Sequence, residues 1–370
     1  MKTRHHSWPQ TARGFTLVEM MVSTVVLALL LIVIVSAMDS VQRSWRRSRE
    51  KVDQFRSARA AFETITRQLT QATLNTYWDY HYAETGSNAP PVETATPPSA
   101  YVRQSELHFI TGQASELIGD TVTRPVSGHA LFFQAPLGHS SQFRGLGSLL
   151  NGRGFYVQWR SNESTRPDFL PSGVSPVKER YQLMEYRPIS EQATVDGRAL
   201  RGNSIYTNPD GWFKEDLELQ SRAVASNILA LFISPRTAQT EEGSEPWWIA
   251  PSYRYDSRDT DNSTAALDKL VITEGGVVRQ GTQHLLPPLV RVTLIASDEE
   301  SFARWLELNP EAGGKILERA GAPFAAAGQH DQDLVALKQY LDGEHLNYRV
   351  FSQSMPLRNA AWDSRLAANP

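Results

Sequence analysis

Carboxylate side chains form the two patterns in this sequence that could do chemistry. The first is a lone carboxylate, Glu19, which is the one charged residue in the apolar run from Phe15 to Met38. A charge inside an apolar helix is rare without a partner, so Glu19 implies a nearby cation. The second pattern is a cluster of aspartates, namely Asp256, Asp259, Asp261 and Asp268. Carboxylate oxygens are the ligands that calcium prefers, which makes this cluster a candidate calcium site.

The aspartate cluster departs from the standard calcium-binding loop. Counted from Asp259, Thr264 replaces the turn glycine and Leu270 replaces the closing glutamate of an EF-hand. The sequence also lacks cysteine, the glycine pattern of a dinucleotide site and the nucleophile elbow of a serine hydrolase. We therefore predict a protein that is not an enzyme and that has no cofactor, apart from the candidate calcium.

Composition excludes several other classes of protein. The chain has 370 residues and a net charge of −3, with 21% charged and 9% aromatic residues. These values exclude wholesale disorder and a coiled-coil rod, and the near-neutral charge disfavours nucleic acid as a partner. A mean hydropathy of −0.38 is typical of a soluble protein, but this average conceals the apolar N-terminal segment.

The element that carries Glu19 is long enough to cross a membrane. As a helix, the 24 residues from Phe15 to Met38 would measure about 36 Å, against about 30 Å for a hydrocarbon core. The basic residues Lys2, Arg4 and Arg13 precede it and predict a cytoplasmic N-terminus. Between positions 43 and 59, however, seven basic residues outnumber two acidic ones, which alone would favour the reverse topology.

Three interpretations of this segment compete. It could be an ordinary signal anchor, or a secretory signal cleaved after the small residues Val35-Ser36-Ala37. Both leave Glu19 unexplained. The third interpretation rests on residues 14–19, which read GFTLVE and resemble the processing motif of type IV prepilins.

The prepilin resemblance implies a specific role for each residue of the motif. A prepilin peptidase would cut between Gly14 and Phe15, and the new N-terminal Phe15 would be N-methylated. Glu19 would then neutralise the terminal ammonium of a neighbouring subunit during assembly. The resemblance also places the leader in the cytoplasm, the span in the inner membrane, and the head in the periplasm or on the cell surface.

Beyond the span, apolar residues continue at helical spacing, and a proline-rich stretch follows them. The stripe runs through Val41, Trp45, Val52, Phe55, Phe62, Ile65 and Leu69. It predicts a helix that packs on its own head, on neighbouring subunits, or on both. The predicted organisation is a leader at 1–14, a transmembrane helix at 15–38, an amphipathic continuation at 39–75, a linker loop at 76–105 and a head at 106–370.

The head has the pattern of an α+β domain built on antiparallel strands. Short β-rich runs are separated by turn residues and lie at 106–110, 129–134, 154–160, 180–186, 224–233, 289–296 and 346–352. Helical spacing at about 298–308 and 332–342 predicts two helical insertions. The complete prediction is thus a long N-terminal helix packed on a β-rich, pilin-like head.

Several of these runs resemble, in their order, the J-type minor pseudopilins of type II secretion. The runs ELHFIT, RYQLMEY and VASNILALFI are followed by Trp247-Trp248 and by a Val-rich strand after Leu286-Pro287. The layout is also similar to the prepilin-like "Verru_Chthon cassette protein C" family.

From these resemblances we expect a structural minor pseudopilin of a type II secretion-like pseudopilus. Its expected partners are prepilin peptidase, other pilin or pseudopilin subunits and the inner membrane. A type IV minor pilin for adhesion or DNA uptake, and a membrane-anchored binding protein or enzyme with an uncut anchor, remain alternatives.

Overall fold

The computed structural model separates into two compact units, which we describe individually. It describes residues 16–82, 97–140, 142–143, 145–163, 169, 177–191, 193–195, 198–200, 208, 210–237, 249–259 and 280–360. The first unit is Met1–Asp53 and the second is Gln54–Pro370. Helix α1, Leu17–Leu69, contributes residues to both.

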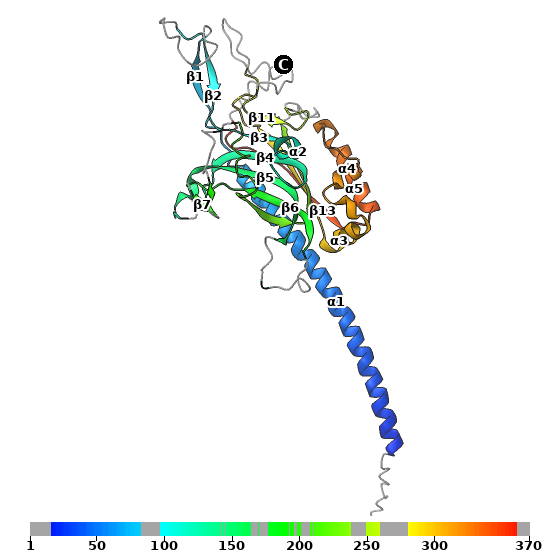
Figure 1. The fold of residues 1–370 in the computed structure, drawn as a ribbon. Coiled ribbons are helices and arrows are strands. Elements are labelled where there is room, and N and C mark those ends of the chain that lie inside the picture. The colour runs from blue at the N-terminus through cyan, green and yellow to red at the C-terminus, as the bar shows by residue number, and fades with distance from the viewer. Residues whose placement is uncertain are drawn as a thin grey trace, which may run out of the picture. The chain divides into compact units, whose positions relative to one another are not determined.

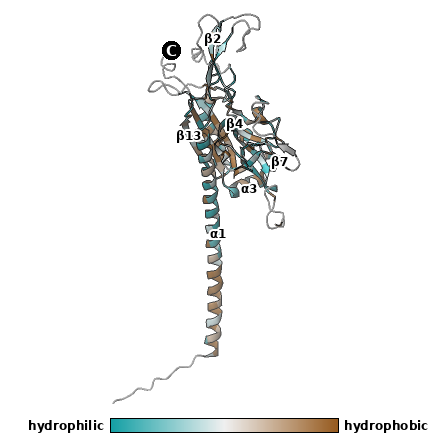
Figure 2. Ribbon diagram, turned by 90° about the vertical axis from the view of Figure 1, so that its left-hand side faces the viewer, coloured by the Kyte–Doolittle hydropathy of each residue, from teal (hydrophilic) through white to brown (hydrophobic). Residues whose placement is uncertain are grey.

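The first unit consists, in its described part, of the N-terminal portion of α1. Its large apolar side chains between Leu17 and Met38 are 49% to 75% exposed. The ribbon of α1 is mostly hydrophobic over its N-terminal stretch and becomes hydrophilic farther along the helix (Figure 2). Among the residues described, α1 is the one helix long and apolar enough to cross a membrane. Exposure of this apolar surface to water is unfavourable, and the hydrocarbon core of a membrane would cover it.

A nine-stranded sheet forms the centre of the second unit (Figure 1). Seven strands run in the order β13-β12-β10-β4-β5-β6-β9, and β3 joins β4 to β11. The strands are β3 Ile110–Gln113, β4 Val126–Pro136, β5 Leu150–Ser161, β6 Glu179–Tyr186, β9 Ser221–Ser226, β10 Ile228–Arg236, β11 Tyr255–Asp256, β12 Leu289–Ser297 and β13 Tyr348–Pro356. Two hairpins stand apart from it, β1 Tyr77–His81 with β2 Ala100–Gln104, and β7 Ala193–Val195 with β8 Arg198–Leu200.

The sheet has a parallel joint between β4 and β10, at Gly128 and Leu231. Gly128 has a φ of +70°, and a Cβ atom there would lie 2.4 Å from the Leu231 carbonyl oxygen. Glycine is therefore required for this close approach. The buried imidazole of His129 crosses the same joint, because its Nδ1 accepts a hydrogen bond of 3.1 Å from the Ile233 N–H.

The helices of this unit pack beside the sheet. Three of them lie between β12 and β13 in the sequence and sit together in space (Figure 1): α3 Glu299–Leu308, α4 Ile316–Arg319 and α5 His330–Gly343. Phe302 of α3 contacts Trp159 and Tyr181 of the sheet, with ring centroids 6.0 and 5.8 Å apart. A fourth, α2 Ala114–Ile118, follows β3 directly. A 3-10 turn at Pro310–Ala312 follows α3, and another at Ala327–Gln329 leads directly into α5.

The C-terminal part of α1 packs into this unit at two places. Ile65 and Leu69 are fully buried in the core, and the ring of Phe62 lies 6.0 Å from that of Phe351 on β13. Gln68 donates a hydrogen bond of 3.0 Å to Glu185 on β6. One helix thus contacts strands from both halves of the sheet.

The α+β class and most of the predicted strands are confirmed, as are the two helical insertions. The predicted continuation of the helix to residue 75 is wrong, because α1 ends at Leu69 and Thr73 then donates a backbone bond of 2.9 Å to Gln134. The predicted linker at 76–105 contains β1 and β2. The spacing of apolar residues would allow the helix to continue, but the backbone bond between Thr73 and Gln134 ends it.

Two predicted strands begin or divide differently in the structure. The strand expected at 106–110 starts only at Ile110, because side chains take the preceding amides: Gln134 accepts from the His108 N–H, and Ser257 from the Phe109 N–H. The strand expected at 224–233 is split into β9 and β10 at Asn227, whose φ of 59° turns the chain.

Candidate processing and assembly site

Thr16 and Glu19 form a reciprocal pair of hydrogen bonds at the start of α1. The Glu19 carboxylate accepts from the Thr16 backbone N–H and from its hydroxyl, each at 2.9 Å. The Thr16 hydroxyl oxygen accepts in turn from the Glu19 N–H at 3.3 Å. This is a capping box, in which the residue before the helix and the third helical residue satisfy each other's backbone donors.

The capping box changes the interpretation of Glu19. Its charge lies at the end of a helix where backbone N–H groups point outward and favour an anion. The lone carboxylate therefore has a local partner within one turn, in addition to any cation supplied from outside. The sequence carries this signal, since Thr16-Leu17-Val18-Glu19 has the T-x-x-E spacing of a capping box.

The other predicted residues of this site lie outside the described part of the chain. Gly14 and Phe15 immediately precede Thr16, so cleavage between them would leave the capping box one residue from the new N-terminus. Cleavage after Gly14, methylation of Phe15 and an assembly role for Glu19 stay predictions.

The candidate calcium site is only partly described. Asp256 lies on β11, and its carboxylate is 2.8 Å from Nε2 of the buried His108 and accepts a bond of 2.9 Å from the Arg258 N–H. Burial acts to raise the pKa of Asp256, but the hydrogen bonds from His108 and from the Arg258 N–H, with the positive charge of Arg254, outweigh this and leave the pKa lowered. Asp261 and Asp268 lie outside the described residues, as does the pair Trp247-Trp248.

The described residues contain no group of three or more metal-binding side chains. His108 instead belongs to a buried relay, because its Nδ1 accepts a bond of 3.1 Å from the indole N–H of Trp212. That bond makes Nε2 the protonated nitrogen, which donates to Asp256. A ligand role for Asp256 would require this relay to open, and calcium binding remains a prediction.

Sequence reasoning missed two further features of the head. The buried carboxylate of Glu185 accepts bonds from Gln68 and from Arg222, at 3.0 and 2.7 Å. On the β1–β2 hairpin, Trp78 and Tyr101 are 55% and 59% exposed, and the ring of Tyr101 lies 5.2 Å from that of Tyr80. The burial of Glu185 and the exposure of the hairpin aromatic residues both depend on tertiary structure. Neither feature therefore has a signal in the sequence.

Comparison with known proteins identifies the N-terminal segment. Residues 10–35 match the family model described as the prokaryotic N-terminal methylation motif. This motif is typical of type IV prepilins, and it implies processing by prepilin peptidase and assembly with other pilin subunits. One N-terminal apolar helix fits a single-pass, membrane-anchored protein.

The match covers the first residues of α1 and leaves the head unassigned. No curated protein and no solved structure matches the chain significantly. The resemblances to J-type pseudopilins and to the cassette family thus rest on the order of the strands alone.

Proposed function

Because this chain is a type IV prepilin-like protein, we propose that it is a minor structural subunit of a pseudopilus of the type II secretion kind. The observation that carries the proposal is the N-terminus itself: the methylation motif, the apolar span and a carboxylate placed at the first turn. The order of strands in the head supports the J type within this class.

The proposed mechanism is assembly from a membrane store. The apolar part of α1 holds the subunit in the inner membrane, with its N-terminus in the cytoplasm and its head in the periplasm or on the cell surface. After cleavage, Glu19 would exchange its bonds to Thr16 for the ammonium group of Phe15 on a neighbouring subunit. An ion pair formed in an apolar environment is strong, since little water competes for either charge.

The size of the head supports a minor position in the filament. The second unit extends over Gln54–Pro370 and is a single body with one hydrophobic core. Heads of this bulk would crowd a helical array in which every subunit is identical, whereas a tip or occasional position leaves room. We propose no catalytic role and no required cofactor for it.

A second candidate function is a type IV minor pilin for adhesion. The exposed Trp78, Tyr80 and Tyr101 on a projecting hairpin (Figure 1) favour it, because aromatic side chains are enriched at binding surfaces. The near-neutral charge of the chain disfavours DNA uptake.

N-terminal sequencing and intact mass of the membrane-extracted chain test the processing step. We expect a chain that begins at methylated Phe15. A chain that still begins at Met1, or one cut after Ala37, would contradict the proposal and favour an anchored binding protein or an enzyme.

A pair of variants tests the role of Glu19. We expect Glu19→Ala to leave cleavage largely intact and to reduce co-purification with partner subunits, because the carboxylate is lost. Thr16→Ala is the matched control, since it weakens the capping box but keeps the carboxylate. If Thr16→Ala reduces co-assembly as much as Glu19→Ala, helix capping and not charge pairing explains the effect.

A further inference from the structure

We propose that the segment of α1 just beyond the span binds anionic phospholipid headgroups. The side chains responsible are Arg43, Trp45, Arg46 and Arg49, which we name the arginine collar. This inference depends on membrane anchoring and is independent of whether the chain enters a filament.

The first observation is the charge of this part of the helix. Residues 40–49 read SVQRSWRRSR and contain four arginines, and Asp39 and Glu50 flank this stretch; residues 39–53 together hold five basic and three acidic residues, so the segment is net positive. Arg43 donates to the neutral backbone carbonyl of Asp39, which does not cancel its charge. Arg49 is 77% exposed, and its nearest approach to Asp53 is 4.0 Å. The collar therefore presents positive charge to its surroundings.

The second observation is the distance of the collar from the span. At 1.5 Å per residue, Arg43 lies about 7 Å beyond Met38 along the helix, and Arg49 about 16 Å beyond it. A polar headgroup layer adds about 5–7 Å to each side of the hydrocarbon core. Side chains on a helix leave it tilted toward its N-terminus, and Arg43 reaches back one turn to the Asp39 carbonyl, so this arginine points toward the span. The Arg43 guanidinium can thus reach lipid phosphates, which arginine can bind in bidentate fashion. Arg46 and Arg49 lie beyond the headgroup layer and attract its negative charge from within a Debye length of about 10 Å.

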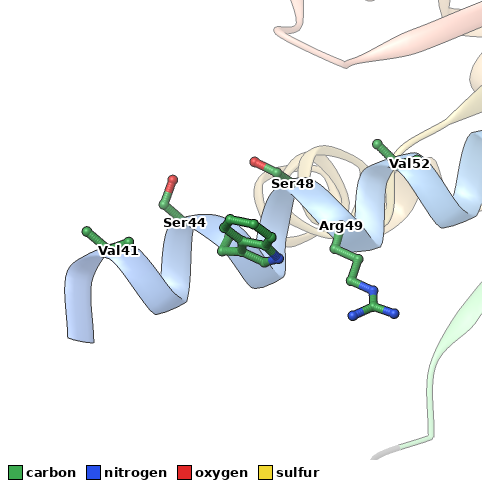
Figure 3. Close-up of a pocket in the computed structure, with 6 residues that line it drawn as sticks. Val41, Ser44, Ser48, Arg49 and Val52 are labelled. Atoms are coloured by element: carbon green, nitrogen blue, oxygen red, sulfur yellow. The ribbon is translucent and has the colours of Figure 1, made fainter. Parts of the chain in front are cut away.

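The third observation is the surface on which Trp45 lies. Val41, Ser44, Ser48 and Val52 follow one side of the helix, and Arg49 points away at its edge (Figure 3). The Trp45 side chain, 72% exposed, helps to line the same shallow groove. An exposed tryptophan next to a span is typical of the aromatic belt at a membrane surface. Small apolar and aromatic residues on one side and arginines around them match a lipid surface with anionic headgroups.

The absence of cysteine in the chain allows a direct test. A Ser44→Cys variant of the full chain would carry a single environment-sensitive fluorophore on the collar. In neutral detergent, short-chain phosphatidylglycerol should shift the emission of the probe, whereas phosphatidylcholine and inorganic phosphate should not. Each arginine near an anionic surface contributes roughly a fivefold gain in affinity.

Matched variants test whether lipid binding depends on the arginines of the collar or on the positive charge of the whole protein. Replacing Arg43, Arg46 and Arg49 together with glutamine should weaken phosphatidylglycerol binding about a hundredfold. The control replaces Arg124, Arg304 and Arg319, which are exposed on the head, and should keep full affinity. Circular dichroism verifies that each variant keeps its helix.

Three results would overturn the proposal. The first is an equal response to phosphatidylcholine and phosphatidylglycerol, or a response to inorganic phosphate alone. The second is unchanged binding in the collar variant. The third is a shift that depends on protein concentration without added lipid, which would assign the groove to a second copy of the chain. None of these readouts requires cleavage or filament assembly, so failure here leaves the proposed function intact.

Discussion

Protonation of His129 should destabilise the head in mild acid. The imidazole is buried between β4 and β10, and burial lowers its pKa to about 4, although its hydrogen bonds to the Phe324 and Ile233 carbonyls act to raise it. The unfolded chain has an ordinary histidine pKa of about 6.5. Stability from the neutral imidazole is therefore fully present above about pH 6.5 and is lost as the pH falls from there toward about 4.

The size of this loss follows from the difference between the two pKa values. At about pH 5, His129 is protonated in the unfolded state but not in the folded state. Stability therefore falls with pH over the roughly 1.5 pH units between about 6.5 and about 5. At 1.36 kcal/mol per unit, His129 should account for about 2 kcal/mol of lost stability between about pH 7.5 and pH 5. Buried carboxylates with lowered pKa values, such as Glu185, contribute little in this window because they titrate below it.

A glutamine variant isolates the contribution of His129. The amide of His129→Gln can accept from the Ile233 N–H and donate to the Phe324 carbonyl, but it cannot be protonated in this range. Urea unfolding of both proteins in neutral detergent, followed by circular dichroism at each pH, yields four free energies. His284 and His330, whose pKa values are also lowered to about 4 by burial, cancel in the comparison. An equal loss in both proteins would refute the reasoning.

Three other substitutions, the first with a matched control, probe the packing and charge pairing of the head. Ile65→Ala should cost about 3 kcal/mol of unfolding free energy in urea because it empties a fully buried position, whereas exposed Arg67→Ala should change it by less than about 0.5 kcal/mol; similar losses would exclude tight packing of α1. Glu185→Gln should cost about 3 kcal/mol at neutral pH by leaving the buried Arg153 without a counter-charge and by breaking the ion pair with the half-exposed Arg222. Burial acts to raise the pKa of Glu185 but its bonds leave it lowered, so the deficit of the variant should shrink below about pH 4.5, and a constant deficit would contradict this. Gly128→Ala should lower the thermal midpoint sharply, because the new methyl group meets the Leu231 carbonyl oxygen, and an unchanged midpoint would show that the joint can open without cost.

Local patterns in the sequence predicted the elements whose contacts are local. The span and its first turn depend on adjacent residues, and so do the strands whose apolar and polar residues alternate. The end of α1 could not be predicted, because the contact of Thr73 with Gln134 joins segments far apart in the sequence. The same holds for the late start of β3, where the Ser257 hydroxyl accepts a hydrogen bond from the Phe109 backbone N–H.

The candidate site shows the same division. The capping box of Thr16 and Glu19 could have been recognised from spacing alone. The relay from Trp212 through His108 to Asp256 joins three distant segments, and no spacing rule would have brought them together. A cluster of aspartates in the sequence is therefore weak evidence for calcium, because the Asp256 carboxylate is already bonded to His108 and to the Arg258 N–H.

The parallel joint at Gly128 divides the sheet into two blocks, with β10, β12 and β13 on one side and β3, β4, β5, β6, β9 and β11 on the other. Such a short seam would part easily if a force acted on one block alone. Helix α1 reaches both blocks, through Phe62 against β13 and through Gln68 against β6. We therefore expect a pull on this part of the helix to act on both blocks together, and not on the joint between them alone.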